Sequence, residues 1–467
     1  MKLFKKVAFL LAAFMVLANP IACAAEAVEA EVTEVQEELY SNWAIPALND
    51  ATKTGIDYLL GDENLKAQIT AEQLKQLTDN LKTKIDGEKL AADKSNKSIE
   101  IVGEVNTREN VLNAIFNIVS KYDTNAPKGE GVVEYLVEKG VLLGDENGQR
   151  LEDVATVEEA IILADRALTK LFKEKGVAAK GLFWKVENKG NTVYMLGSIH
   201  LANSTLYPIR QEVIDAFESS DELFLEVVMD NPEGIAYLQS KQLYEEGKTL
   251  KDDIGEELFA GLAEIFTQIG LDEESLGQLK PWAVYLSLAS LSAQVQGETE
   301  GPTTQITGQH GIDMHFLDKA NDMDMHVDEL ESYQFQADLF DNVPVETYIE
   351  LFQQTIDNIA KAAENPEAFA EESKEAAEAF PKMLKAWKDG DRKAMAEILA
   401  SASDDPLNQV IFGQRDKNMA DGIEKLLNSD EKKTYFVIVG AGHLAPENSA
   451  TGYLTEKGFK VENLNIN

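Results

Sequence analysis

The sequence predicts an α/β fold whose core sheet contains two similar strand–Gly-x-x-His–helix–strand units. A helical insertion separates the units, and a mostly helical module precedes them. The main observation is a repeat, because residues 192–202 (Thr-Val-Tyr-Met-Leu-Gly-Ser-Ile-His-Leu-Ala) match residues 434–445 (Thr-Tyr-Phe-Val-Ile-Val-Gly-Ala-Gly-His-Leu-Ala). Each segment has a β-branched and aromatic run, typical of a buried strand, that stops at a glycine. The length of 467 residues also exceeds what one hydrophobic core usually holds, so several domains are expected.

Residues 1–25 have the pattern of a secretory signal peptide, because three early lysines precede the apolar run 7–17 and small residues follow. Cleavage near Ala24 or Ala25 would remove Cys23, the one cysteine, and exclude disulfide and thiolate chemistry. Lipidation of Cys23 is the alternative, although Pro20 stands where lipoprotein signals prefer leucine. We therefore expect a secreted or cell-surface protein, with no membrane-spanning segment after residue 25.

The chain is strongly acidic, with 82 Asp and Glu residues against 43 Lys and Arg residues and a formal net charge of −39. Nucleic acid is excluded as a partner on this ground, because its phosphates need a basic surface. We interpret the excess charge as a solvated face that keeps the protein soluble.

The region before the repeat is predicted to be helical. Residues 26–39 are acidic and small and indicate a disordered linker. In residues 40–175, the segment 55–64 (Gly-Ile-Asp-Tyr-Leu-Leu-Gly-Asp-Glu-Asn) recurs in shorter form at 140–147. Three Thr-x-Glu elements open amphipathic stretches, and those at Thr70 and Thr156 have capping-box spacing, which predicts helix starts.

This N-terminal region resembles S-layer homology repeats, which bind cell-wall polysaccharide. The segment containing Thr107, Arg108 and Glu109 is similar to the Ile-Thr-Arg-x-Glu helix start of those repeats, and Trp43 to their early aromatic residue. The other two Thr-x-Glu elements lack the arginine. The resemblance implies wall binding through Thr107, Arg108 and Glu109, and the alternative is a helical spacer with ordinary caps.

From residue 181 onwards strands and helices alternate. The expected elements are a hairpin of strands 183–186 and 192–196, a helix at 208–218, a strand at 222–228, helices within 232–300 and 343–400, a helix at 414–427, a strand at 434–439, a helix at 449–457 and a strand at 459–464. The chain has five histidines, and two of them, His200 and His443, follow the matched strands. Since α/β sheets bind ligands beyond their strand ends, the pair indicates convergence on one metal or one substrate.

Residues 181–467 resemble the TraB/GumN family, which includes the Tiki metalloproteases and the pheromone-shutdown proteins of enterococci. The matching segments, in chain order, are 183–186, 194–200, 206–208, 220–226, 280–282, 311–313, 330–336, 415–419 and 439–444. They contain both Gly-x-x-His motifs, a Pro-Trp pair, a Gly-x-Asp and an Arg-Asp-x-x-Met. One departure is Ala445-Pro446, where the family often has glycine after the second His-Leu.

The resemblance implies an exported metal-dependent hydrolase, specifically a peptidase acting on a peptide or protein. His200 and His443 would be metal ligands, and Glu226 a third ligand or the general base. The metal would be divalent manganese, cobalt, zinc or iron. Arg415 would neutralise Glu226 or stabilise an oxyanion. Asp313 and Glu331 would orient a histidine.

Two other functions stay open on the sequence alone. The first is a protein that sequesters a peptide or another ligand without turnover, and the second is a haem- or iron-binding protein. The remaining histidines are interpreted as surface residues at positions 310 and 315 and as a structural residue at His326. No Gly-x-Ser-x-Gly, phosphate-binding loop or His-Glu-x-x-His motif is present, so serine hydrolase, nucleotide-binding and zincin chemistry have no support.

Overall fold

The computed structural model describes residues 39–61, 64–92, 99, 101, 106–145, 147–296, 305–369, 374, 378–400 and 406–465. The predicted signal peptide, Cys23 and nearly all of the predicted linker lie outside these residues. Among the helices in these ranges, none is long and apolar enough to cross a membrane.

A six-stranded sheet forms the centre of the fold, in the order β4-β3-β5-β2-β1-β6. The strands are β1 (Leu182–Asn188), β2 (Asn191–Ser198), β3 (Glu222–Leu225), β4 (His326–Glu329), β5 (Thr434–Gly440) and β6 (Glu462–Asn463). Strands β4, β3, β5 and β2 run parallel, whereas β1 runs antiparallel to β2 and β6. The predicted α/β class and the β1–β2 hairpin are thereby confirmed.

The two matched segments form neighbouring parallel strands. In the register of β2 and β5, Gly197 pairs with Val439 and Ser198 pairs with Gly440, so the two strands end at the same edge of the sheet. The strand that follows each motif has a different place, however, because β3 pairs with β5 whereas β6 pairs with β1 at the far edge. An internal duplication therefore stays a prediction from the sequence.

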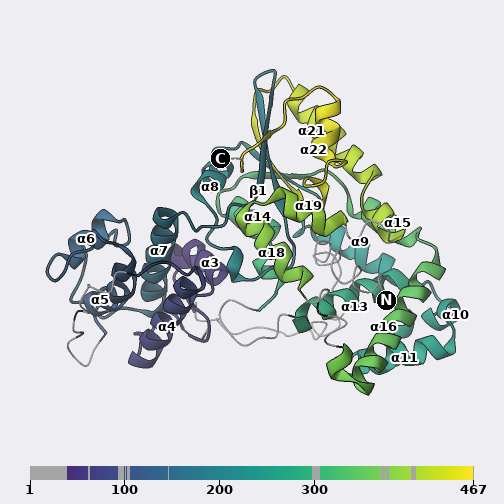
Figure 1. Cartoon of the computed structure of the whole chain (residues 1–467), viewed down its shortest axis with the longest axis horizontal. Helices are drawn as coiled ribbons and strands as arrows, with labels where there is room; N and C mark the ends of the chain where they lie inside the picture. The colour runs from purple at the N-terminus through teal and green to yellow at the C-terminus, as the bar shows by residue number, and fades with distance from the viewer. Residues whose placement is uncertain are drawn as a thin grey trace.

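Helices pack against the sheet around a shared apolar core. They are α8 (Gln211–Glu218), α14 (Ile312–Asp322), α21 (Gln414–Asn428) and α22 (Ala450–Glu456), and Figure 1 shows α8 on one side of the strands and α21 and α22 on the other. The ring of Phe436 on β5 lies 6.0, 5.4 and 5.3 Å from the rings of Phe183, Phe217 and Phe316. Helix α8 begins later than predicted, because Pro208 and Arg210 hydrogen-bond to Ala179 before it.

A helical insertion lies at the end of the molecule away from the helices of residues 45–175 (Figure 1). Its helices, together with those that lead back to the sheet, are α9 (Pro232–Gln242), α10 (Leu250–Ile254), α11 (Glu256–Thr267), α12 (Glu273–Gln278), α13 (Pro281–Gln296), α15 (Tyr333–Asp341), α16 (Val345–Glu364), α18 (Ala379–Asp389), α19 (Arg392–Ala400) and α20 (Pro406–Ile411). Helix α13 packs on α16, and Trp282 stacks on Phe340 with ring centroids 6.1 Å apart.

The N-terminal region is helical, as predicted, and has a hydrophobic core of its own. Its helices are α3 (Ile45–Thr54), α4 (Ala71–Gly87), α5 (Arg108–Val119), α6 (Val132–Glu138) and α7 (Val157–Lys175). Thr70, Thr107 and Thr156 are N-caps of α4, α5 and α7, and the caps at Thr70 and Thr156 are complete capping boxes. The predicted helix starts are thus confirmed.

Candidate functional site

Four polar residues follow the ends of four adjacent parallel strands. His200 follows β2, Glu226 follows β3, Glu331 follows β4 and His443 follows β5. All four are buried, with at most 8% of each residue exposed. Because parallel strands end at the same edge of a sheet, residues separated by up to 243 positions in the sequence meet there.

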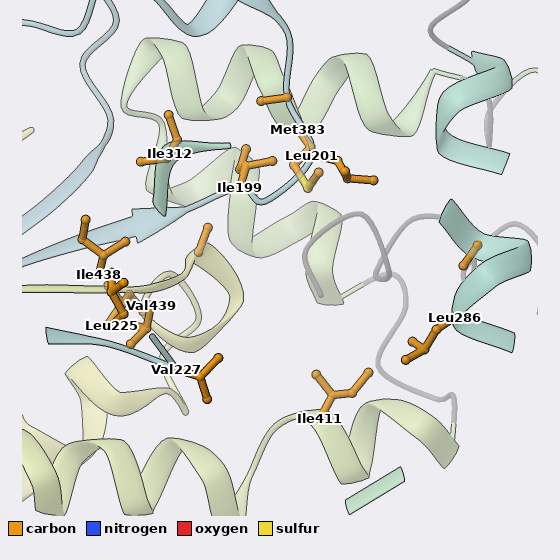
Figure 2. Packing of buried hydrophobic residues seen from close by; sticks show 14 of the residues in the cluster. Ile199, Leu201, Leu225, Val227, Leu286, Ile312, Met383, Ile411, Ile438 and Val439 are labelled. Carbon is orange, nitrogen blue, oxygen red and sulfur yellow. The ribbon is translucent and has the colours of Figure 1, made fainter. Parts of the chain in front are cut away.

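Apolar neighbours anchor two of these strand ends and the start of α14. Ile199, Leu225 and Ile312 immediately precede His200, Glu226 and Asp313, and all three are almost fully buried. Figure 2 shows Ile199, Leu225 and Ile312 among the packed side chains of this core. Burial of each apolar residue fixes the backbone beside it, and this limits the directions open to the polar side chain that follows.

Arg415 joins the two glutamates. It lies in the first turn of α21, where its Nε is 2.8 Å from Glu331 Oε1 and its Nη2 is 2.6 Å from Glu331 Oε2. The same Nη2 is 3.0 Å from Glu226 Oε2. The paired contacts to Glu331 use the planar fork of the guanidinium, which makes this a directional, charge-assisted interaction. Arg415 therefore holds both carboxylates in place at the sheet edge.

Glu226 lies between Arg415 and His443. Its Oε1 accepts a hydrogen bond of 2.6 Å from the Gly440 N–H and lies 3.9 Å from His443 Nε2. Burial acts to raise its pKa, but the charges of His443, Arg415 and His200, with the Gly440 hydrogen bond, hold the pKa at about 2. Glu226 is thus an ionised carboxylate with a hydrogen bond on each oxygen.

His200 is held by Asp313, at the start of α14. Its Nδ1 hydrogen-bonds to Asp313 Oδ2, and the Ile312 N–H donates to the Ile199 carbonyl at 3.1 Å. Gly311 permits this approach, because a Cβ there would lie 2.5 Å from the His200 carbonyl oxygen. Burial acts to lower the pKa of His200, but the Asp313 carboxylate outweighs it and raises the pKa.

His443 has a similar partner that the sequence interpretation missed. Its Nδ1 lies 2.7 Å from Oδ1 of Asp416, whose Oδ2 accepts a hydrogen bond of 2.9 Å from the Gly413 N–H. Each histidine is therefore held through Nδ1 by a buried aspartate. In the sequence, Asp416 could have been identified as a candidate from its position beside Arg415 in the Arg-Asp-x-x-Met segment.

Other histidines and Glu331 differ from the expectations. His315 is buried rather than exposed, 5.0 Å from the Tyr207 ring, and burial lowers its pKa well below the usual value. The surface interpretation was therefore wrong for His315, whereas His310 is partly exposed, with its Nδ1 2.7 Å from Thr307 Oγ1. Glu331 contacts Arg415 and Gln336 instead of a histidine. His326 is exposed on β4.

The predicted wall-binding residues lie in the N-terminal region, at the start of α5. Thr107 caps the helix, Glu109 is exposed, and Arg108 pairs with Glu159 at 2.6 Å. Arg108 also lines a pocket of about 450 Å³, whose other lining residues include Trp43, Leu143, Arg150, Glu158 and Arg166. The pocket brings arginines and carboxylates together with an exposed aromatic residue.

No group of three or more His, Cys, Asp or Glu side chains that could hold a metal is found among the residues that the structure describes. His200, Glu226 and His443 are brought to one edge of the sheet, yet their side chains do not form a complete ligand set. Of these groups, His443 Nε2 and Glu226 Oε1 lie 3.9 Å apart.

Comparison with known families gives a match over the region that contains all of these sheet-edge residues. The model of the TraB/PrgY/gumN family matches residues 182–463, which is more than half of the chain. Comparisons with curated proteins and with solved structures gave no match. The extent of the family match shows that the chain belongs to the TraB/PrgY/gumN family.

Proposed function

We propose that this protein is an exported metal-dependent hydrolase that cleaves peptides. The observation that carries the proposal is the pair of buried histidines, each bound through Nδ1 to an aspartate, at one sheet edge with Glu226. A carboxylate on one ring nitrogen is the usual support of a metal-ligating histidine, because it fixes the tautomer and directs the other nitrogen to the metal. The ligands would be His200, His443 and Glu226.

The charges at the sheet edge fit a divalent cation. Asp313, Asp416, Glu226 and Glu331 are buried there, with Arg415 as the guanidinium that pairs with the two glutamates. A buried surplus of carboxylates is costly unless positive charge compensates it, and a metal ion supplies such charge. The imidazole and carboxylate donors suit zinc, manganese, cobalt or iron.

The protein's own residues have separable tasks in this proposal. Asp313 and Asp416 orient the two imidazoles, and Arg415 with the Gly440 N–H orients Glu226. Its positive neighbours lower the pKa of Glu226 and so weaken it as a base near neutral pH, which favours the role of ligand over that of general base. When bound, the metal would supply Lewis acidity and an activated water.

The test combines elemental analysis of the purified chain with cleavage of a peptide library after reconstitution with each candidate metal. We expect about one metal per chain and measurable turnover. Glu226→Gln should lose turnover together with metal, whereas His326→Ala, on an exposed position of β4, should keep both. Turnover that persists in metal-free protein would contradict the proposal.

A second candidate is a protein that sequesters a peptide without cleaving it. Both oxygens of Glu226 accept hydrogen bonds and its pKa is lowered, so it is not poised as a base, and binding without cleavage requires no base. Saturable peptide binding by the metal-loaded protein with no product by mass spectrometry would support this candidate. A Soret band on adding haemin would instead support the haem-binding alternative.

For the N-terminal region we propose binding to cell-wall polysaccharide at the pocket beside Arg108. An exposed aromatic face with arginine and carboxylate groups provides the stacking and hydrogen bonds that a charged sugar requires. Trp43 is 60% exposed and lines the pocket, so Trp43→Ala should reduce pelleting of the full chain with purified cell wall. Leu59→Ala, at an exposed residue outside the pocket lining, is the control.

A further inference from the structure

Two lysines of the N-terminal region reach into the part of the fold that holds His200. Lys84 on α4 is 4% exposed and donates a hydrogen bond to the Ser204 carbonyl, in the short helix η3 (Ser204–Leu206). Lys53 on α3 is equally buried and donates to the Gln309 carbonyl, in η4 (Gly308–His310). Ser204 lies four positions after His200, and Gln309 four positions before Asp313.

The segments that the lysines bind form one structural unit. Ala202 and Thr307 exchange two backbone hydrogen bonds of 3.1 and 2.9 Å. The Tyr207 hydroxyl donates to the His310 carbonyl at 2.9 Å. We call residues 199–207 and 307–313 the His200 unit. It contains both members of the His200–Asp313 pair, so both lysines act on the same support.

Ion pairs surround the two buried contacts. Lys319 of α14 lies 2.9 Å from Asp50 of α3, Lys53 lies 3.3 Å from Asp318, and Lys388 of α18 pairs with Glu88. Partly exposed pairs contribute little energy each. The first two nevertheless limit the orientation in which α3 meets α14, and the third joins the end of α4 to α18. The contact between the N-terminal helices and the sheet domain therefore pairs opposite charges from the two regions.

Burial of the lysines makes this contact selective. A buried ammonium group is costly unless it is hydrogen-bonded, so an imprecise fit would leave Lys53 and Lys84 unsatisfied. Burial, with the charge of Lys388, lowers the pKa of Lys84 to about 7, although Glu88 and Asp165 oppose this. A buried lysine such as Lys84 lowers the stability of the fold, and a region that served only as a spacer would not need one.

We propose that the N-terminal helical region positions the His200–Asp313 pair, with Lys53 and Lys84 as the positioning residues. The region is then part of the site. The consequence for turnover rests on the proposed function. The positioning itself can be tested whether or not the protein is a hydrolase.

The experiment measures the full chain by hydrogen–deuterium exchange and by nitrogen-detected NMR of the histidine rings. Lys84→Met and Lys53→Met should each speed exchange in the His200 unit by about tenfold or more and shift the His200 ring signals. The His443 ring signals should stay in place. Lys84→Arg should restore part of the protection because it keeps a donor. Lys75→Met, on the exposed face of α4, is the matched control.

A charge exchange covers the case in which a buried substitution prevents folding. Asp50→Lys and Lys319→Glu each place like charges at the contact and should speed exchange in the His200 unit, whereas the double variant should recover towards wild type. Unchanged exchange and unchanged His200 signals in folded Lys53→Met and Lys84→Met would overturn the proposal. Equal effects on His200 and His443 would also overturn it, because they indicate a general loss of stability.

Discussion

His200 and His443 share a sequence motif and an aspartate partner, but different parts of the chain support them. His443 and Asp416 are 27 residues apart and belong to one C-terminal segment, where the Phe412 ring packs 5.2 Å from the imidazole. His200 and Asp313 are 113 residues apart, and their unit contacts the N-terminal region. Two similar motifs thus depend on separate regions for their geometry. We therefore expect substitutions to perturb the His200–Asp313 half and the His443–Asp416 half of the site independently.

Loss of Arg415 should have the largest effect, because this one guanidinium pairs with both buried glutamates, Glu226 and Glu331. Arg415→Met leaves two carboxylates buried without their guanidinium and should lower the free energy of unfolding by about 3–5 kcal/mol. Urea denaturation measures the change. Lys417→Met, on an exposed position of the same helix, should stay within about 0.5 kcal/mol of wild type. A small loss in Arg415→Met would mean that the glutamates do not need this pairing.

The pH dependence should follow Glu226. Its pKa in the folded protein lies below its ordinary value of 4.5, so its ionised form stabilises the fold above that pH. The difference in unfolding free energy between wild type and Glu226→Gln should therefore shrink as the pH falls from 4.5 towards 2. Glu462→Gln, at an exposed residue of β6, should show a constant difference. A difference that grows in acid would contradict the assignment.

The aspartates should separate the two halves. Asp313→Asn and Asp416→Asn keep the shape of the side chain but remove its charge, and each should weaken metal binding by about 10–100-fold. In metal-free protein, Asp313→Asn should shift the His200 ring signals and leave those of His443, and Asp416→Asn should do the reverse. Isothermal titration and histidine NMR give the two readouts. Shifts in both rings for either variant would mean that the pairs are coupled.

Substitutions at two glycines, one near each histidine, should have the smallest effects on the free energy of unfolding. A Cβ at Gly311 would lie 2.5 Å from the His200 carbonyl oxygen, whereas a Cβ at Gly442 would lie 2.6 Å from the end of the Phe412 ring. The backbone cannot move aside as readily as a side chain, so Gly311→Ala should cost about 1–3 kcal/mol and Gly442→Ala less. Thermal unfolding of the two variants measures this order, and the reverse order would show that the Phe412 ring is the more rigid neighbour.

The strands and helix starts could be predicted because their signals are local. The β-branched runs before Gly197 and Gly440 form buried parallel strands, and Thr70 and Thr156 form the capping boxes that their spacing indicates. The meeting of His200 and His443 followed from placing both motifs at strand ends. Each strand end and each helix start depends on residues within a few positions of one another.

The other features depend on contacts between distant segments. The Arg-Asp-x-x-Met segment marks Asp416 as a candidate, but it does not indicate that His443 is the partner of Asp416, and nothing near Glu331 indicates that Arg415 is its partner. His315 was interpreted as a surface residue because its spacing of five from His310 does not suit two ligands on one helix face, but Tyr207 covers it in the fold. The burial of Lys84 depends on how the N-terminal region docks against the segment that contains Ser204, and the sequence pattern of α4 does not indicate this contact.

The central claim is that His200 and His443 hold one divalent metal together. The most direct measurement is the metal content of wild type, His200→Ala and His443→Ala after identical loading and dialysis, with His326→Ala as the control. We predict about one metal per chain in wild type and the control, and none retained in either of the other variants, although both stay folded by circular dichroism. Full metal occupancy in either His200→Ala or His443→Ala would contradict the shared site.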